Sequence, residues 1–259
     1  MAIWSLVIGA CPLTGAVKLQ VRDGRPFVDG VYVNGHGPYR FLLDTGTNIN
    51  LIETGLARKI GMESTFEHEV QSSTGQTWLP GSDGNVVELG PVRADGQRFQ
   101  FSKLETLHLA WPDVHGVLGQ CFLSGFDYML DLRGKLLEFG KQNPDGNRSQ
   151  FRLQDGRSAV STSLGDLVLD SGAPRLILFG VAPDPGERSN MWTVSGSQSV
   201  GMVSSKLAIE GRNVWRGSAV AIPALAEPGV AGLMPLSLFR TVYVCNSEGY
   251  VVFEWPEGR

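Results

Sequence analysis

Short apolar runs separated by glycine, asparagine and aspartate recur along the whole chain, and they predict a protein built mainly from β-strands. Residues 27–33 and 207–214 are typical of short strands broken by Gly, Asn and Asp turns, and Asn34-Gly35 favours a tight hairpin turn. One helix is expected at residues 53–60. The 33 glycines and 14 prolines among 259 residues agree with a folded, turn-rich chain.

The same series of motifs occurs twice in the sequence. The first series is FLLDTGTNINLI (41–52), SSTGQTW (72–78), HGVLGQCFL (115–123) and FDYMLDLRGKLLEF (126–139). The second series is LVLDSGAPRLIL (167–178), VSGSQSV (194–200), AGLMPLSLF (231–239) and TVYVCNSEGYVVFE (241–254). This repeat predicts two related halves, at residues 17–140 and 151–259, joined by a polar, turn-rich linker at residues 141–150.

Each half contains one acidic triplet in the same apolar setting, Asp44-Thr45-Gly46 and Asp170-Ser171-Gly172. An apolar triplet precedes each aspartate and a further apolar run follows it. This setting indicates a buried strand, a sharp turn that carries the acid, and a second buried strand. A single triplet would be a weak indication of function, but two in one repeated framework favour an active site with two carboxyl groups.

With these motifs the chain resembles the pepsin and retropepsin superfamily of aspartic peptidases, from about Phe27 to Phe253. The resemblance implies a mostly β, bilobed fold in which two β-barrel-like lobes each contribute one aspartate to a site between them. It includes the loop Val117-Leu118-Gly119, which in the family supports the aspartate turn. Asp44 and Asp170 are then the catalytic residues of an aspartic endopeptidase.

The expected chemistry depends on two neighbouring carboxyl groups. Held about 3 Å apart they cannot both ionise, so one keeps a proton while the other acts as a base toward a bound water molecule. The family likeness implies that the Thr45 and Ser171 hydroxyls form hydrogen bonds across the lobe interface. It also implies that the Gly46 and Gly172 amides face the carboxylates and hold each acid in one orientation.

Thr47 and Ala173 occupy equivalent positions, three residues after each aspartate. The Thr47 hydroxyl is expected to donate to Asp44 and stabilise its anion, whereas Ala173 has no side-chain donor to offer Asp170. We therefore predict that Asp170 is the carboxyl that more often carries the shared proton of the coupled pair.

A flap is expected over the site, because Gly75, Gln76, Thr77 and Trp78 lie where the family places the hairpin that closes over substrate. Trp78 either lines a substrate pocket or is an ordinary half-buried strand aromatic. The equivalent segment of the second half, residues 196–198, is either a second flap or a surface hairpin, and the surface hairpin is slightly favoured.

Two prolines distinguish the second half: Pro235 stands where Gly119 aligns, and Pro174 follows Gly172 and Ala173. They motivate an alternative in which the fold is kept by a binding or scaffold protein that has lost peptidase activity. In a second alternative, each half is a retropepsin-like unit that needs a partner chain. In a third, an unrelated β-sandwich carries two accidental triplets, and its aspartates lie far apart.

Composition and charge argue against several other functions. The net charge of −4 is spread over interspersed acidic and basic residues, so nucleic acid is not an expected partner. The three cysteines and four histidines are scattered, so neither a metal nor a redox cofactor is indicated. The expected partner is an extended peptide or protein substrate, and the protein is expected to be a monomer.

The first eleven residues, MAIWSLVIGAC, end in small residues and Cys11, as the end of a bacterial lipoprotein signal does. No lysine or arginine precedes this run, so a first β-strand is the alternative for residues 1–16. The signal interpretation predicts the cell envelope or periplasm, with a membrane link only through a lipid anchor at Cys11; a cytoplasmic location stays open. No other apolar run is long enough to span a membrane.

Overall fold

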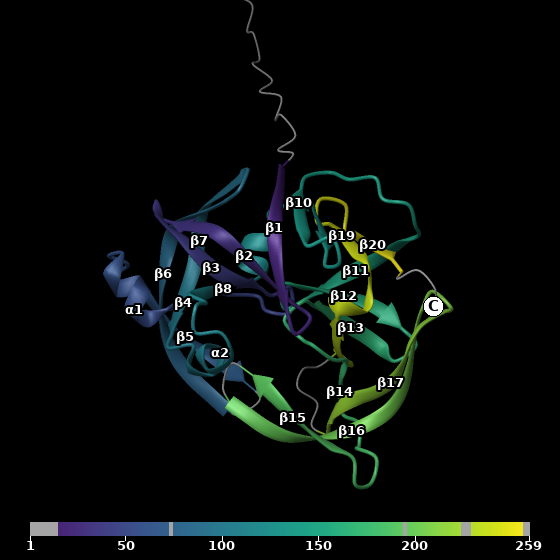
Figure 1. Cartoon of the computed structure of the whole chain (residues 1–259). Helices are drawn as coiled ribbons and strands as arrows, with labels where there is room; N and C mark the ends of the chain where they lie inside the picture. Colours follow the sequence, from purple (N-terminus) through teal and green to yellow (C-terminus); the bar gives the residue numbers. More distant parts are fainter. Residues whose placement is uncertain (1–14, 73–74, 194–195, 224–228, 256–259) are drawn as a thin grey trace, which may run out of the picture.

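The computed structural model describes residues 15–72, 75–193, 196–223 and 229–255, which form a mostly β structure (Figure 1). The first half contains β1 (Gly15–Arg22), β2 (Arg25–Val33), β3 (His36–Leu43), β4 (Asn50–Glu53), α1 (Thr54–Lys59), β5 (Phe66–Ser72), β6 (Gly75–Leu89), β7 (Val92–Ser102), α2 (Glu105–Ala110), β8 (Gly116–Leu118), α3 (Gln120–Leu123), β9 (Tyr128–Asp131) and β10 (Leu136–Phe139). The second half contains β11 (Arg148–Gln154), β12 (Arg157–Thr162), β13 (Gly165–Asp170), β14 (Ile177–Phe179), β15 (Arg188–Thr193), β16 (Gly196–Ile209), β17 (Arg212–Ile222), β18 (Gly232–Pro235), the 3-10 helix η1 (Leu236–Leu238), β19 (Thr241–Cys245) and β20 (Tyr250–Glu254).

The two halves share one pattern of strand pairing, so the repeated motifs mark repeated structure. In the first half β3 pairs in parallel with β8, and β4 lies parallel to β7 and antiparallel to β8. In the second half β13 pairs in parallel with β18, and β14 lies parallel to β17 and antiparallel to β18. Each half therefore places its acidic turn at the end of a strand that is held by the same neighbours.

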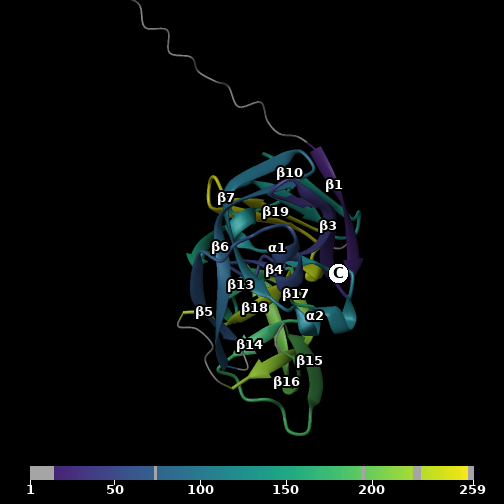
Figure 2. The same ribbon diagram turned by 90° about the vertical axis from the view of Figure 1, so that its left-hand side faces the viewer.

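A six-stranded antiparallel sheet joins the halves. Its strands run in the order β1, β10, β9, β19, β20 and β11, with β9 and β19 paired at the junction. Leu130 of β9 and Val242 of β19 are paired and fully buried in one apolar core that contains residues of both halves. This sheet lies at one end of the molecule and the β15–β16 hairpin at the other (Figures 1 and 2).

Local signals in the sequence were read correctly at two places. The predicted helix is α1, and the Glu53 carboxylate caps it by accepting hydrogen bonds from the amides of Gly55 and Leu56. The Asn34-Gly35 hairpin is also confirmed: both residues have positive φ, as a tight turn between β2 and β3 requires.

Residues 207–214 contain the predicted break, because Glu210 and Gly211 adopt positive φ and form the turn between β16 and β17. One other segment differs from its prediction. Within the predicted linker at residues 141–150, the last three residues belong to β11 and pair with β20. The backbones of these three residues pair with β20 and add an edge strand to the six-stranded sheet. Their polar composition gave no indication of this pairing.

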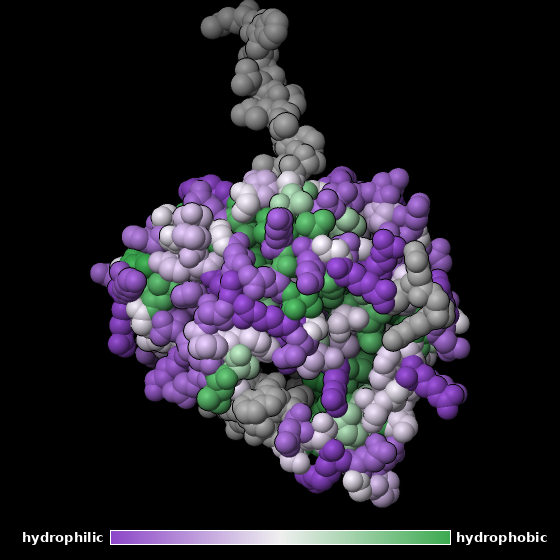
Figure 3. Space-filling view, in the orientation of Figure 1, coloured by the Kyte–Doolittle hydropathy of each residue, from purple (hydrophilic) through white to green (hydrophobic). Residues whose placement is uncertain are grey.

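Cys11 and the rest of residues 1–14 lie outside the described part of the chain, and Gly15 and Ala16 begin β1. The helices with the most residues, α1 and α2, have six each, so no helix in the described ranges could cross a bilayer. The exposed face drawn in Figure 3 is mostly polar, and its surface is hollowed above the β15–β16 hairpin.

Candidate active site

Two acidic turns from opposite halves face each other at the centre of the molecule. Asp44 directly follows β3, and Asp170 is the last residue of β13. A Cβ atom added to Gly46 would lie 2.3 Å from Cγ of Asp170, and one added to Gly172 would lie 2.6 Å from Cγ of Asp44. Only glycine fits at either position, because each turn is covered by the carboxyl group of the other half.

The middle residues of the two turns bind each other. The Thr45 amide donates to Oγ of Ser171 at 3.0 Å, and the Ser171 amide donates to Oγ1 of Thr45 at 2.9 Å. Each hydroxyl then donates to a carbonyl of the opposite half, Thr45 to Leu169 and Ser171 to Leu43, both at 2.8 Å. Thr45 and Ser171 are at most 1% exposed, so these four bonds are shielded from water.

Backbone amides orient both carboxylates. The Gly46 amide donates to Oδ1 of Asp44 at 2.9 Å, and the Ala173 amide donates to Oδ1 of Asp170 at 2.8 Å. Asp170 also receives a hydrogen bond from the Gly172 amide, and its carboxyl hydrogen-bonds to that of Asp44. Two carboxyl groups in contact, each fixed by main-chain donors, are the arrangement that the sequence predicted for water activation.

Comparison with protein families agrees with this geometry: residues 30–122, from β2 to α3, match a family whose model is described as aspartyl protease. Over these residues the chain is similar to aspartyl proteases. The match includes Asp44-Thr45-Gly46 and ends before Asp170, so the equivalence of the second half rests on its strand pairing and its contacts. It indicates a peptidase hydrolase in general, and no curated protein matches the chain in sequence.

The two halves do not hold their acids in equal environments. Burial is the largest influence on both carboxyl groups, and it raises the pKa of each. The negative charge of Asp44 raises the pKa of Asp170 further, whereas the Gly46 amide and two nearby arginines oppose the rise at Asp44. The pKa of Asp170 is therefore raised further than that of Asp44, which favours the shared proton on Asp170.

The predicted reason for this asymmetry differs from the observed one. Within the described residues the Thr47 hydroxyl forms no hydrogen bond with Asp44; the Thr47 carbonyl instead accepts from the Gln120 amide at 2.8 Å. Ala173, expected to offer Asp170 nothing, donates its backbone amide. The asymmetry arises from burial and from charge, since Asp170 is only 6% exposed and Asp44 is less enclosed.

Two arginines that sequence reasoning did not single out brace the acidic turns. Nε of Arg25 donates to the Gly172 carbonyl at 2.7 Å, and a guanidinium nitrogen of Arg157 donates to the Gly46 carbonyl at 3.4 Å. Each arginine opens the equivalent strand, β2 or β12, and reaches the turn of the opposite half. The repeated Asp-Gly-Arg at 23–25 and 155–157 was the available signal.

Pro235 of the second half is accommodated by a matched change at Leu176. In the first half the Gly119 amide donates to Oδ1 of Asn50 at 3.0 Å. The equivalent pair is Pro235, which has no amide hydrogen, and Leu176, a buried residue with no polar side chain. Removing both partners of a hydrogen bond together is nearly neutral, so Pro235 leaves no unsatisfied group there.

The predicted flap is the β5–β6 hairpin. Gly75, Gln76 and Thr77 begin β6 and pair with the end of β5; the described side chains resume at Trp78, which is 63% exposed. Trp78 is therefore not half-buried. The β15–β16 hairpin is its equivalent, with Gly196 in the position of Gly75, and it contacts α2 of the first half.

No group of three or more His, Cys, Asp or Glu side chains is arranged to hold a metal ion in the described ranges.

Proposed function

We propose that the protein is an aspartic endopeptidase in which Asp44 and Asp170 together activate a water molecule. The observation that carries this proposal is the contact between the two carboxyl groups, one from each half, with the proton favoured on Asp170. The family match supports a peptidase in general. The same contact argues against the unrelated β-sandwich, which requires that the aspartates lie far apart.

The proposed reaction uses the two acids in different roles. Ionised Asp44 takes a proton from the water as its oxygen attacks the peptide carbonyl, and Asp170 gives its proton to the carbonyl oxygen. The tetrahedral intermediate collapses when a proton passes from Asp44 to the amide nitrogen and the C–N bond breaks, while one hydroxyl of the intermediate returns its proton to Asp170, which leaves a carboxylic acid, an amine and the starting dyad. The Gly46, Gly172 and Ala173 amides hold the carboxylates in place throughout, so little reorganisation is needed.

One chain contains both halves of the proposed site. The lobes correspond to residues 17–140 and 151–259, and the exchange between Thr45 and Ser171 occurs within the chain. This supports a monomeric enzyme over one that needs a partner chain. An extended peptide would lie between the lobes under the β5–β6 hairpin, where strand-like backbone can form hydrogen bonds with the flap residues 75–78.

The alternative of an inactive binding protein was motivated by Pro174 and Pro235. The matched Leu176 and Pro235 keep the second acidic turn supported, and Asp170 retains its two amide donors. These contacts favour the enzyme over the scaffold. The proposed location remains the cell envelope or periplasm, because the signal-like run ends at Cys11. Mass spectrometry of the N-terminal peptide of the mature protein tests this location.

Cleavage of a mixed peptide library from about pH 3 to about pH 7 tests the peptidase directly. We expect wild-type protein to cleave and pepstatin to inhibit it. Asp44→Asn and Asp170→Asn should each lower the rate by about a hundredfold or more, because each removes one of the two proton-transfer groups. Circular dichroism of each variant controls for folding, and a folded wild type that cleaves nothing across this range would refute the proposal.

A further inference from the structure

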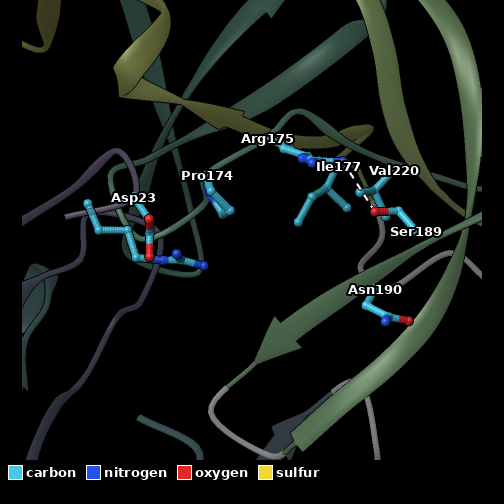
Figure 4. Close-up of a pocket in the computed structure, with 8 residues that line it drawn as sticks. Asp23, Pro174, Arg175, Ile177, Ser189, Asn190 and Val220 are labelled. Carbon is cyan, nitrogen blue, oxygen red and sulfur yellow. Dashed lines mark hydrogen bonds between the residues drawn. The ribbon is translucent and has the colours of Figure 1, made fainter. Parts of the chain in front are cut away.

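A cavity of about 230 Å³ opens beside the Asp170 turn (Figure 4). Both halves line it: Asp23 and Arg25 come from the start of the first half, and the remaining lining residues come from the second half. Figure 4 shows Asp23 and Arg175 on opposite sides of the cavity, with Pro174 between them and Asn190 at its lower edge. Pro174 is four residues after Asp170, so the cavity adjoins the turn that carries this acid.

Two arginines give the cavity its charge. Nε of Arg25 donates to the Gly172 carbonyl, and the guanidinium carbon lies 5.2 Å from the centroid of the Trp111 ring. A guanidinium nitrogen of Arg175 donates to Oγ of Ser189 at 3.2 Å, and Arg175 is otherwise exposed. Since Asp23 is the only acid among the described lining residues, the lining carries a net positive charge.

The corresponding region on the Asp44 side has a different character. The residue five positions after Asp44 is Ile49, where the second half has Arg175. One position earlier, the side-chain amide of Asn48 donates to the Asp155 carboxylate at 2.6 Å. In the second half the equivalent of Asn48 is Pro174, which cannot donate, so Asp23, the equivalent of Asp155, lacks that partner. The repeat has therefore diverged toward positive charge on the Asp170 side alone.

We infer that the cavity beside Asp170 is a substrate subsite for a carboxylate-bearing side chain, glutamate or aspartate, recognised chiefly by Arg175 with Arg25 behind it. This inference rests on the proposed peptidase function and deepens it. The planar guanidinium of arginine matches a carboxylate in charge and in hydrogen-bond geometry. Because Ile49 replaces arginine on the other side, the preference fixes the direction in which a peptide lies across the two acids.

The preference should depend on pH through the substrate carboxyl group, because arginine stays charged throughout the range in which the enzyme works. A glutamate side chain ionises near its ordinary pKa of about 4.3, so selectivity for glutamate over glutamine should appear as pH rises through that value. Arg25 and Arg175 favour the effect, whereas the carboxyl groups of Asp170, Asp23 and Asp44, which all interact with Arg25, oppose it.

The experiment places glutamate or glutamine, in turn, at each of the three positions on either side of the bond cleaved in a reference peptide. At one position we expect wild-type kcat/KM to favour glutamate about five- to tenfold near pH 6, and the ratio to approach 1 near pH 3.5. Arg175→Met should bring the ratio at pH 6 close to 1. Arg133→Met, which removes an exposed arginine between β9 and β10, should leave both the ratio and the rate unchanged.

A binding arm separates this inference from the peptidase proposal. The same peptides, fluorescently labelled, are titrated into Asp170→Asn protein with and without Arg175→Met. Tighter binding of a glutamate peptide that depends on Arg175, without cleavage by wild type, would support the subsite and end the peptidase proposal. Cleavage with a glutamate-to-glutamine ratio near 1 at every position would overturn the subsite alone, and neither cleavage nor selective binding would overturn both.

Discussion

Thr45 and Ser171 lie 126 residues apart in the chain, and each accepts on its hydroxyl oxygen the backbone amide hydrogen bond of the other. Because both hydroxyls also donate across the same boundary, the two acidic turns are joined by four buried hydrogen bonds. We infer that these four hydrogen bonds, more than the contact between the carboxyl groups, hold Asp44 and Asp170 at their distance. Stability and activity are therefore expected to depend on the same four bonds.

Thr45→Val tests this dependence. It keeps the shape of the side chain but leaves the Ser171 amide and the Leu169 carbonyl without partners in a buried site, each at about 1–3 kcal/mol. We expect the free energy of unfolding in urea to fall by about 2 kcal/mol or more, with a parallel loss of peptidase activity. Thr45→Ser retains the hydroxyl and should lose less than about 1 kcal/mol; equal losses in the two variants would contradict this account.

Gly46→Ala tests how closely the halves meet. The new methyl group would need the space of the Asp170 carboxyl group, 2.3 Å from its Cγ, so the acids must move apart. Displacements of about 1 Å in a catalytic group cost on the order of a hundredfold in rate, and we expect kcat to fall by at least that factor. Gly125→Ala is the control, because its added Cβ would meet only the Phe122 carbonyl at 3.5 Å; a Gly46→Ala enzyme of normal kcat would refute the close approach.

Asn50 and Leu176 test whether the two halves use matched polar and apolar supports. Asn50→Leu should destabilise the protein by about 1–3 kcal/mol, because the Gly119 amide loses its acceptor. Leu176→Asn should destabilise by a similar amount or more, since Pro235 offers no amide hydrogen to the new side chain. Thermal unfolding of both variants decides the point, and a neutral Leu176→Asn would show that other donors can serve the second half.

The parts of this protein that the sequence predicted are those with local signals. The acidic turns, the Asn34-Gly35 hairpin and α1 each depend on residues within a few positions of one another. The turn residues within 207–214 are also a local signal, and the pairing of β16 with β17 shows that the chain reverses at Glu210-Gly211.

The features that were missed depend on tertiary contacts. Arg25 meets the Gly172 carbonyl across 147 residues of chain, and no local pattern states which turn an arginine at the start of a strand will reach. Thr47 was expected to bind Asp44 because the two are adjacent, but the loop that contains Gln120 takes its carbonyl. Comparing the repeats residue by residue would have shown the shared Asp-Gly-Arg, which is the signal that was available.

The pH dependence of cleavage follows from the unequal pair. Activity requires Asp44 ionised and Asp170 protonated, so it should fall at low pH as Asp44 gains its proton and at high pH as Asp170 loses its own. Since burial raises the pKa of both groups, both limbs should lie above the ordinary value for aspartate. Arg25→Met removes a positive charge that holds the pKa of Asp44 down, and it should move the acid limb of kcat/KM to higher pH; an unmoved limb would count against this role of Arg25.

The same pair predicts how stability changes with pH. A carboxyl group whose pKa is raised by folding binds its proton more tightly in the folded state, so stability falls as pH rises from the unfolded value through the raised one. For Asp170 this loss of stability ends once pH exceeds its raised folded-state pKa, where the group ionises beside the Asp44 carboxylate.

Asp170→Asn removes the ionisable group with the raised pKa while keeping a similar shape. We expect the variant to have a higher melting temperature than wild type at pH 7, and the advantage to shrink as pH falls toward the ordinary pKa of aspartate, where the wild-type carboxyl is protonated in both states. Asp145→Asn, at an exposed carboxylate, should change little at either pH. A lower melting temperature for Asp170→Asn at pH 7 would mean that the Ala173 and Gly172 amides stabilise the Asp170 anion more than burial and Asp44 oppose it. In that case the proton would belong on Asp44, and the roles of the two acids in cleavage would be exchanged.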